Sequence, residues 1–249
     1  MIRHCHVGSL PFTSLEEAGE FNSKFDLPAL FTLPMKNSNE FMIAEFLFLL
    51  GLGFVEDKKI KLYSLSHLDG LDFQKPFHLD YCLSKFNGKS FKYQLMGPFS
   101  FWMLIKDQYN FSLDDIFSFL IEKFYEFLKP LVALGLELFA IDEPFIQGRN
   151  LAIMNKLFLF ADELSNRLHI DVYIHCCAKI TSDIPEKFQK SLHLDFSLYS
   201  KDEIRSLNEI KFIGSELLST KLPINVIVDQ IKNIEKLYVL PPCGLAMKK

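Results

Sequence analysis

Two stretches of this chain combine residue types that suit zinc binding. His175, Cys176 and Cys177 are consecutive, and Cys243 follows two prolines near the end of the sequence. Zinc prefers imidazole nitrogen and thiolate sulfur, and a catalytic zinc site keeps three protein ligands and an open position. His175, Cys177 and Cys243 are therefore candidate zinc ligands, with Cys176 replacing Cys177 if the strand before them ends one residue earlier. The alternative is that these cysteines belong to the core, because free Cys is among the most buried residue types.

Polar residues follow two other apolar segments. Asp142 and Glu143 come directly after the run Leu-Phe-Ala-Ile, where carboxylates suit binding of an ammonium group or general acid–base catalysis. Asp142 is alternatively the N-cap of a helix in a solvated turn. Gly8 and Ser9 can present backbone N–H groups and a hydroxyl to a substrate carboxylate, although such a pair is commonly only a turn. His6 either faces the same site or lies in the core.

These candidate residues stand where predicted strands end. The sequence predicts strands at Arg3–Val7, Ala29–Leu33, Phe91–Leu95, Leu138–Ile141, Val172–His175, His193–Leu198, Lys211–Ile213 and Leu237–Leu240. It predicts helices at Leu15–Phe25, Asn39–Leu50, Leu113–Leu134, Gly148–Leu168, Ile184–Lys190, Ser200–Leu207 and Ile224–Lys232. Alternating strands and helices indicate an α/β fold with a parallel sheet covered by helices.

Eight strands in 249 residues favour a single (β/α)8 TIM-type barrel that forms one domain over residues 1–249. The active site of such a barrel lies at the carboxyl ends of the strands, where the candidate residues stand. An open Rossmann-like sheet is the alternative, but no Gly-x-Gly-x-x-Gly turn follows a predicted strand. The segment from Asp57 to Gly88 fits the pattern least well, and we expect an irregular insertion there with a short strand at Ile60–Ser64.

Composition narrows the class of protein. Apolar residues make up 49% of the chain and charged residues 23%, which is typical of a folded domain rather than a disordered one. The net charge of −4, with acidic and basic residues interleaved, argues against nucleic acid as a partner. The N-terminus has no apolar signal segment, and the longest apolar run, Phe41 to Phe54, is too short to span a bilayer. We therefore expect a cytoplasmic protein without membrane contact, whose five cysteines are reduced.

Five short segments together resemble a known family. HVGSLPF, QLMGPFSF, IDEPF, HCC and PPCGL occur in the order and at roughly the intervals of the cobalamin-independent methionine synthase family. The resemblance is to the C-terminal catalytic barrel, closest to short single-barrel relatives, and it covers nearly the whole chain. The wider superfamily includes uroporphyrinogen decarboxylase and corrinoid-dependent thiol methyltransferases.

The resemblance implies a zinc ion held by His175, Cys177 and Cys243. A glutamate on the next strand is a fourth ligand in full-length methionine synthase, but the matching stretch here, HLDFSLYS, contains no Glu. Of Asp195, Ser197 and Tyr199 in this stretch, Asp195 is the candidate metal-binding substitute, unless strand alternation points it away from the site. From the resemblance we expect no counterpart of the long N-terminal half of methionine synthase, which helps to accommodate the folate donor.

The resemblance also implies roles in substrate binding. Asp142 matches the residue that holds the amino group of homocysteine, and Gly8 and Ser9 match the turn that meets its carboxylate. Glu45 matches a second carboxylate for the amino group, with an offset of about one residue. Independently of the resemblance, Glu143 is a candidate for assisting proton movement, and the sequence leaves the choice between Asp142 and Glu143 open.

The predicted function is zinc-dependent transfer of a methyl group to a thiol. The expected acceptor is homocysteine, which would give methionine, and methyl-folate is the candidate donor. In the first alternative the donor is a corrinoid protein. In the second, the chain is a non-catalytic barrel that binds zinc or a thiol amino acid.

Overall fold

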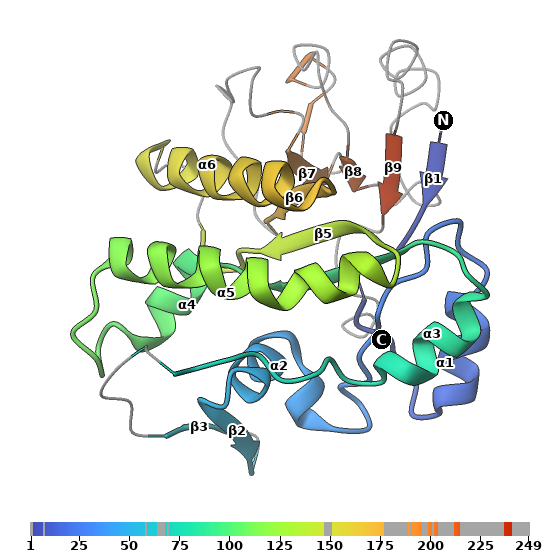
Figure 1. Cartoon of the computed structure of the whole chain (residues 1–249), viewed down its shortest axis with the longest axis horizontal. Coiled ribbons are helices and arrows are strands. Elements are labelled where there is room, and N and C mark those ends of the chain that lie inside the picture. Colours follow the sequence, from blue (N-terminus) through green and yellow to red (C-terminus); the bar gives the residue numbers. More distant parts are fainter. Residues whose placement is uncertain are drawn as a thin grey trace.

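The protein is built on a seven-stranded parallel sheet. A computed structural model describes residues 2–6, 8–57, 59–63, 68, 70–146, 151–176, 189, 191–195, 199–200, 202–203, 212–214 and 237–240. The strand order is β1-β9-β8-β7-β6-β5-β4, and every neighbouring pair is parallel (Figure 1). The strands are β1 (Ile2–His4), β4 (Phe91–Met96), β5 (Leu136–Asp142), β6 (Asp171–His175), β7 (Leu192–Asp195), β8 (Phe212–Gly214) and β9 (Leu237–Leu240). The predicted α/β fold with a parallel sheet is confirmed.

The segment from Leu27 to Thr32 runs beside both edges of this sheet. Single parallel bridges join Leu27 and Thr32 to the N-terminal segment that contains β1, and another joins Ala29 to Lys92 of β4. The segment pairs only at isolated residues, whereas the sequence predicted a continuous strand at Ala29–Leu33. Pro28 contributes to this, since it accepts from the Lys92 N–H (2.8 Å) but has no N–H of its own to donate.

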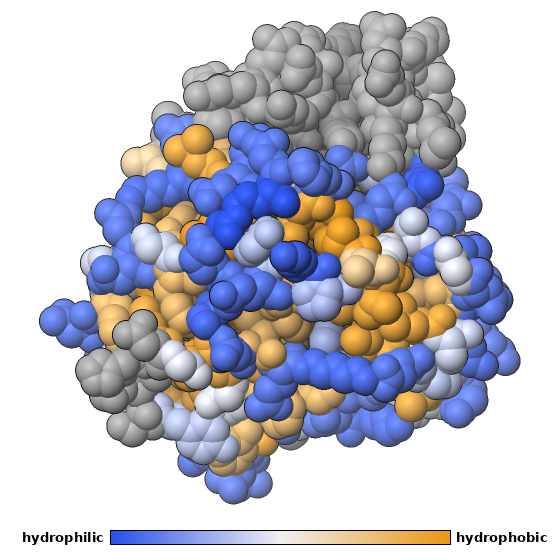
Figure 2. Space-filling view, viewed as in Figure 1, coloured by the Kyte–Doolittle hydropathy of each residue, from blue (hydrophilic) through white to orange (hydrophobic). Residues whose placement is uncertain are grey.

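Helices cover one face of the sheet. The long α5 (Leu113–Ala133) and α6 (Leu151–Leu168) lie side by side against β5 and β6, as Figure 1 shows. Two shorter helices, α2 (Met42–Leu49) and α4 (Pro98–Ile105), pack beside them, and α1 (Leu15–Asn22) contacts α3 (Leu79–Phe86). The outer surface of this layer mixes polar stripes with apolar patches (Figure 2). No helix in the described part of the chain is both long and apolar enough to cross a bilayer.

Capping residues set where two helices begin. The Ser112 side chain accepts from the Asp115 N–H (3.1 Å), and the Asp115 carboxylate accepts in return from the Ser112 N–H (2.9 Å), which completes a capping box at the start of α5. Ser14 caps α1 through the Glu17 N–H. Both capping serines can be recognised in the sequence, and both predicted helices form.

Two apolar clusters divide the strand side chains between the faces of the sheet. Residues such as Phe139 and Ile174 pack against the helices, where the Phe124 and Phe139 rings meet edge to face with centroids 5.5 Å apart. Several of the 26 phenylalanines gather in this layer. The opposite side, here called the inner face, carries a second cluster of Cys5, Leu27, Leu138, Ala140, Tyr173, Tyr238 and Leu240. Alternation along each strand fixes which residues face inward.

The region from Asp57 to Gly88 is more regular than predicted. It contains helix α3 and strand β3 (Lys59–Leu62), which pairs antiparallel with β2 (Gly53–Glu56) to form a hairpin. The extra strand predicted at Ile60–Ser64 is therefore present but begins one residue earlier. The predicted helices at Ile184–Lys190, Ser200–Leu207 and Ile224–Lys232 lie wholly or mostly outside the described residues.

Candidate functional site

Three polar residues lie in one row across neighbouring strands, and two of them end their strands. Asp142 at the end of β5 pairs in register with His175 at the end of β6, and His175 pairs with His193 in β7. Neighbouring residues in a parallel ladder point to the same face, so all three side chains belong to the inner face. Their exposed fractions are 3%, 8% and 1% respectively. The sequence placed Asp142 and His175 at one end of the sheet, and the structure brings them into adjacent strands.

The two histidines bond directly to each other. The Nδ1 atoms of His175 and His193 lie 2.7 Å apart, so one ring donates and the other accepts. Burial holds the pKa of His193 well below its usual value, and the neighbouring His175 lowers that pKa further. The Nε2 atom of His193 is buried and has no hydrogen-bond partner within the described part of the chain.

His193 was not among the site residues predicted from the sequence. The sequence feature that could have indicated His193 is its position near the start of the predicted strand that follows the strand of His175. Its register opposite His175 depends on how β6 and β7 align, and strand alignment cannot be read from the sequence.

The predicted metal ligands are only partly within the described residues. Cys177 and Cys243 lie outside them, and for Asp195 the structure describes the backbone alone, as the last residue of β7. Among the described residues, no group of three or more His, Cys, Asp or Glu is arranged to hold a metal ion. The thiol of Cys176 donates to the carbonyl of Ile146 (3.4 Å) and belongs to the helix-side cluster. Cys176 therefore lies on the opposite side of the sheet from His175.

The turn at Gly8 is closed by His6. The Gly8 N–H donates to the Nδ1 atom of His6 (3.0 Å), while the other ring nitrogen of His6 bonds the Asn22 side chain (2.5 Å). Burial lowers the pKa of His6 to about 3, so the ring is neutral. Ser9 bridges to Thr32. His6 is therefore a buried structural histidine, and the Gly8 amide predicted to meet a substrate carboxylate is already hydrogen-bonded.

A buried lysine lies near this turn on the inner face. Lys92 is 0% exposed, and its ammonium group donates to Oε1 of Gln94 (2.7 Å). Gln94 packs against Gly8 so closely that a Cβ on Gly8, whose φ is +98°, would lie 3.0 Å from the Gln94 amide carbon. Lys92 was not identified from the sequence, because an isolated lysine in a predicted strand gives no sign of burial.

Glu143 anchors the start of helix α4. Its carboxylate accepts from the backbone N–H groups of Phe99 (3.0 Å) and Ser100 (2.8 Å) and from the Ser100 hydroxyl (2.6 Å). Burial raises the pKa of Glu143 to about 7, and the hydrogen bonds from Ser100 and Phe99 act in the opposite direction. Gly97 is required here because a Cβ at this position would lie 2.2 Å from the Glu143 carboxylate. The fit of Glu143 to a helix N-terminus explains its burial.

Glu45 lies on the helix side of the sheet. The Tyr93 hydroxyl donates to Oε1 of Glu45 (3.0 Å), and Tyr93 points to the opposite face of β4 from Lys92 and Gln94. Burial raises the pKa of Glu45 to about 8, and the negative charges of Glu40 and Asp142 raise it further.

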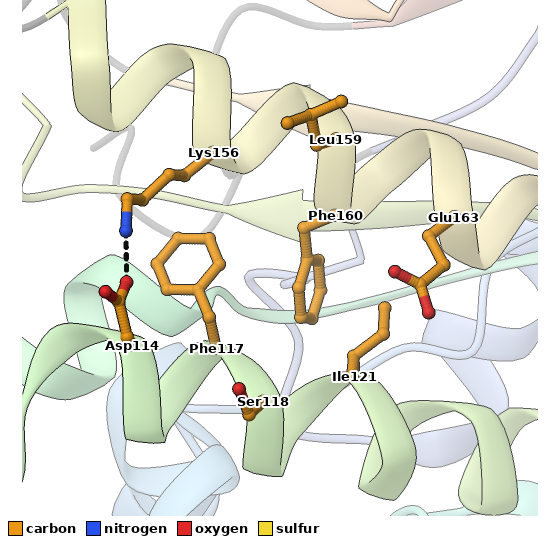
Figure 3. Close-up of a pocket in the computed structure, with 8 residues that line it drawn as sticks. All are labelled: Asp114, Phe117, Ser118, Ile121, Lys156, Leu159, Phe160 and Glu163. Atoms are coloured by element: carbon orange, nitrogen blue, oxygen red, sulfur yellow. Dashed lines mark hydrogen bonds and ion pairs between the residues drawn. The ribbon is translucent and has the colours of Figure 1, made fainter.

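A separate groove of about 300 Å³ lies between α5 and α6. Phe117 and Phe160 face each other across it, and a salt bridge between Lys156 and Asp114 spans one end, as Figure 3 shows. All its lining residues belong to these two helices. The groove is thus on the outer layer and has no part in the row of Asp142, His175 and His193.

Comparison with known proteins identifies the family. Residues 71–222, more than half of the chain, match the family described as cobalamin-independent synthase, N-terminal domain. The chain belongs to the cobalamin-independent synthase family. The family expected from the five sequence segments is confirmed, but the matching domain is the N-terminal one, whereas the segments resemble the C-terminal catalytic barrel.

Solved structures support the fold of this synthase-family chain. A methyltransferase from Methanosarcina mazei matches with a TM-score of 0.56 and 13% identity, over 93% of this chain and 78% of its own. A putative vitamin-B12-independent methionine synthase from Listeria monocytogenes matches with a TM-score of 0.50 and 12% identity, over 81% of this chain and 71% of its own. No curated protein sequence matches. At these identities the likeness concerns the fold alone.

Proposed function

We propose that this synthase-family chain is a zinc-dependent methyltransferase that moves a methyl group to a thiol, with homocysteine as the acceptor. The observation that carries the proposal is the buried row of Asp142, His175 and His193, in which Asp142 and His175 end adjacent parallel strands and His193 lies opposite His175 in the next strand. A carboxylate beside an imidazole at this edge offers one group for a substrate ammonium and one for a metal.

We further propose that the sheet is a complete (β/α)8 barrel. The segment from Leu27 to Thr32 makes parallel bridges to both β1-side residues and β4, which are the two edges of the seven-stranded sheet. An eighth strand position between these edges would close the ring. The inner face would then be the barrel interior, with the candidate site at its mouth.

One feature of the described residues fits a zinc ion, namely the hydrogen bond that His193 makes to His175. His193 hydrogen-bonds Nδ1 of His175, and a metal-binding histidine usually makes such a bond through the ring nitrogen that does not hold the metal. His175, Cys177 and Cys243 are the proposed ligands. When bound, zinc would lower the pKa of a coordinated substrate thiol so that the sulfur is held as a nucleophilic thiolate.

The chain's own residues would orient the substrate. Asp142, which is 3% exposed, is proposed to bind the ammonium group of homocysteine and so to fix the position of its sulfur. Glu143 would act chiefly as a positioning residue, since three hydrogen bonds hold its carboxylate against α4 while its own N–H donates to the carbonyl of His175 (2.8 Å). Gly8, Ser9 and Glu45 stay predicted substrate contacts.

A second candidate function has a specific observation in its favour. The matching family domain is the N-terminal one, whereas the proposed zinc ligands were assigned by resemblance to the C-terminal catalytic barrel. A barrel that binds a thiol amino acid without turnover fits this match. A methyltransferase with a corrinoid protein as donor remains a variant of the first proposal.

The direct test is methyl transfer by the purified, zinc-loaded protein. L-Homocysteine is supplied with either a methyl-folate or a methylated corrinoid protein, and methionine is measured by mass spectrometry. We expect methionine from one donor, and a loss of at least about tenfold in Asp142→Asn, because a hydrogen-bonded charge pair contributes about 1.5–3 kcal/mol. Asp162→Asn, an exposed change on α6, is the matched control. Homocysteine binding without methionine formation would favour the second candidate, and absence of binding would overturn both.

A further inference from the structure

Lys92 is a buried cation that forms no ion pair with any described residue. Its side chain is 0% exposed, and its only hydrogen bond in the described part of the chain runs to the neutral amide of Gln94 (2.7 Å). The Tyr173 ring lies 5.8 Å from the ammonium group, and no carboxylate of a described residue lies within 4.0 Å of it. An ammonium group can donate three hydrogen bonds, so most of its capacity is unused.

Such an arrangement is costly for a purely structural lysine. Buried charges in proteins are normally paired and hydrogen-bonded, because removing an ammonium group from water costs several kcal/mol. Burial lowers the pKa of Lys92 from its usual 10.5 to about 8, while the negative charge of Asp142 acts in the opposite direction. At neutral pH the amine therefore still carries its proton, and an anion brought to it would relieve the cost of its burial.

The position of Lys92 directs it toward the candidate site. On the inner face its next neighbour toward the carboxyl end of β4 is Gln94, and the Lys92 ammonium group reaches that residue. Gln94 in turn lies against the turn at Gly8. Asp142 ends the adjacent strand on the same face and is close enough to influence the pKa of Lys92. One buried cation and one buried anion thus share the inner face.

We propose that Lys92 is a further substrate-binding residue, whose ammonium group pairs with the carboxylate of the thiol amino acid that Asp142 holds by its ammonium group. An α-amino acid carries both charges on a single carbon, so a site that binds it needs an anion and a cation facing the same space. The Gly8 N–H, the donor expected for this carboxylate, is already taken by His6. This inference rests on the proposed function, in that it assumes a thiol amino acid as substrate.

The test compares three small thiols by isothermal titration under reducing conditions. The probes are L-homocysteine, 3-aminopropane-1-thiol, which lacks the carboxylate, and 4-mercaptobutanoate, which lacks the amino group. Wild type should bind L-homocysteine at least about tenfold more tightly than 3-aminopropane-1-thiol, since a hydrogen-bonded charge pair is worth that much. Lys92→Met should bind these two with equal affinity. Lys129→Met, which removes an exposed lysine from α5, should keep the wild-type preference.

The outcomes separate this inference from the proposed function. A Lys92→Met protein that keeps the preference overturns the role of Lys92 and leaves the proposed function intact. If wild type binds 4-mercaptobutanoate but not L-homocysteine, and Lys92→Met loses that binding, the proposed function fails and Lys92 stands as a carboxylate-binding group. If wild type binds none of the three, both are overturned. Lys92→Gln is the second variant, and circular dichroism checks that each protein is folded.

Discussion

At the scale of single residues, there are two classes of buried polar group. Groups of the first class make hydrogen bonds that stabilise the fold, and groups of the second class leave part of their bonding capacity unused. His6 and Glu143 belong to the first class, since their hydrogen bonds close a turn and begin a helix. Lys92 and His193 belong to the second, because among the described residues the Lys92 ammonium group has no ion-pair partner and Nε2 of His193 has no hydrogen-bond partner. Incompletely bonded buried groups are costly, so they are the ones for which a ligand is the natural explanation.

Replacing Lys92 by methionine should stabilise the protein without ligand. The folded-state pKa of about 8 lies below the usual 10.5, so the unfolded chain binds more protons between these values and the stability of wild type rises with pH through this window. The gain in Lys92→Met should therefore be greatest below pH 8, at most about 3 kcal/mol, and should shrink toward pH 10.5. Urea unfolding at several pH values measures this difference. A gain that is independent of pH would contradict it.

The contact between Gly97 and Glu143 should appear as a strong energetic coupling. Gly97→Ala places a Cβ 2.2 Å from the carboxylate and 2.6 Å from the Ile141 side chain, which should cost about 1–3 kcal/mol of stability. Glu143→Ala should also destabilise, because the Ser100 and Phe99 donors lose their acceptor. In the double variant the clash with the carboxylate is absent, so the combined cost should be less than the sum. Additive costs would argue against the contact.

Loss of His193 should weaken metal binding if His175 holds zinc. His193→Phe keeps a ring of similar size but removes the hydrogen bond to His175, and changes of this kind typically cost about 10–100-fold in metal affinity. His193→Asn, whose amide oxygen can still accept, should retain more affinity. Competition with a chelator measures the effect, and His169→Phe, on the surface, is the control. Unchanged affinity in His193→Phe would leave His193 with a packing role only.

At the scale of elements, the sequence predicted helix and strand bounds best where residues close in sequence determine them. Ser112 and the apolar spacing behind it were enough to predict α5 to within one residue, and β9 was predicted with its observed bounds. Helix α4 was missed because its start depends on Glu143, which lies more than forty residues away in sequence. The row of His193 and His175 was missed for the same reason, since pairing between strands is set by the tertiary structure.

The capping box of α5 offers a test at this scale. Ser112→Ala removes the acceptor for the Asp115 N–H and the donor to the Asp115 carboxylate, so it should cost about 1 kcal/mol of stability. Ser84→Ala, which removes an exposed hydroxyl bonded to a helix carbonyl, should change stability much less. Thermal unfolding compares the two. An equal, small effect of both changes would contradict the capping role of Ser112.

At the scale of the whole molecule, the parallel sheet brings the candidate residues together. Parallel strands bring their carboxyl ends to one edge, so residues as distant in sequence as Gly8, Gln94, Asp142 and His175 come to the same region. The Leu27–Thr32 segment lies between the two edge strands, where closure of the barrel would place the eighth strand. The parallel sheet agrees with membership of the synthase family. Whether the protein binds zinc has to be measured.

Zinc content is the measurement that tests the central claim most directly. The protein is purified without added metal, supplied with zinc, freed of excess and examined by elemental analysis, together with His175→Ala and Cys243→Ser. The proposal predicts about one zinc ion per wild-type chain and a marked loss in both variants. A wild-type protein that retains no zinc would contradict activation of a thiol by metal, and would favour a synthase-family protein that binds its ligand without this chemistry.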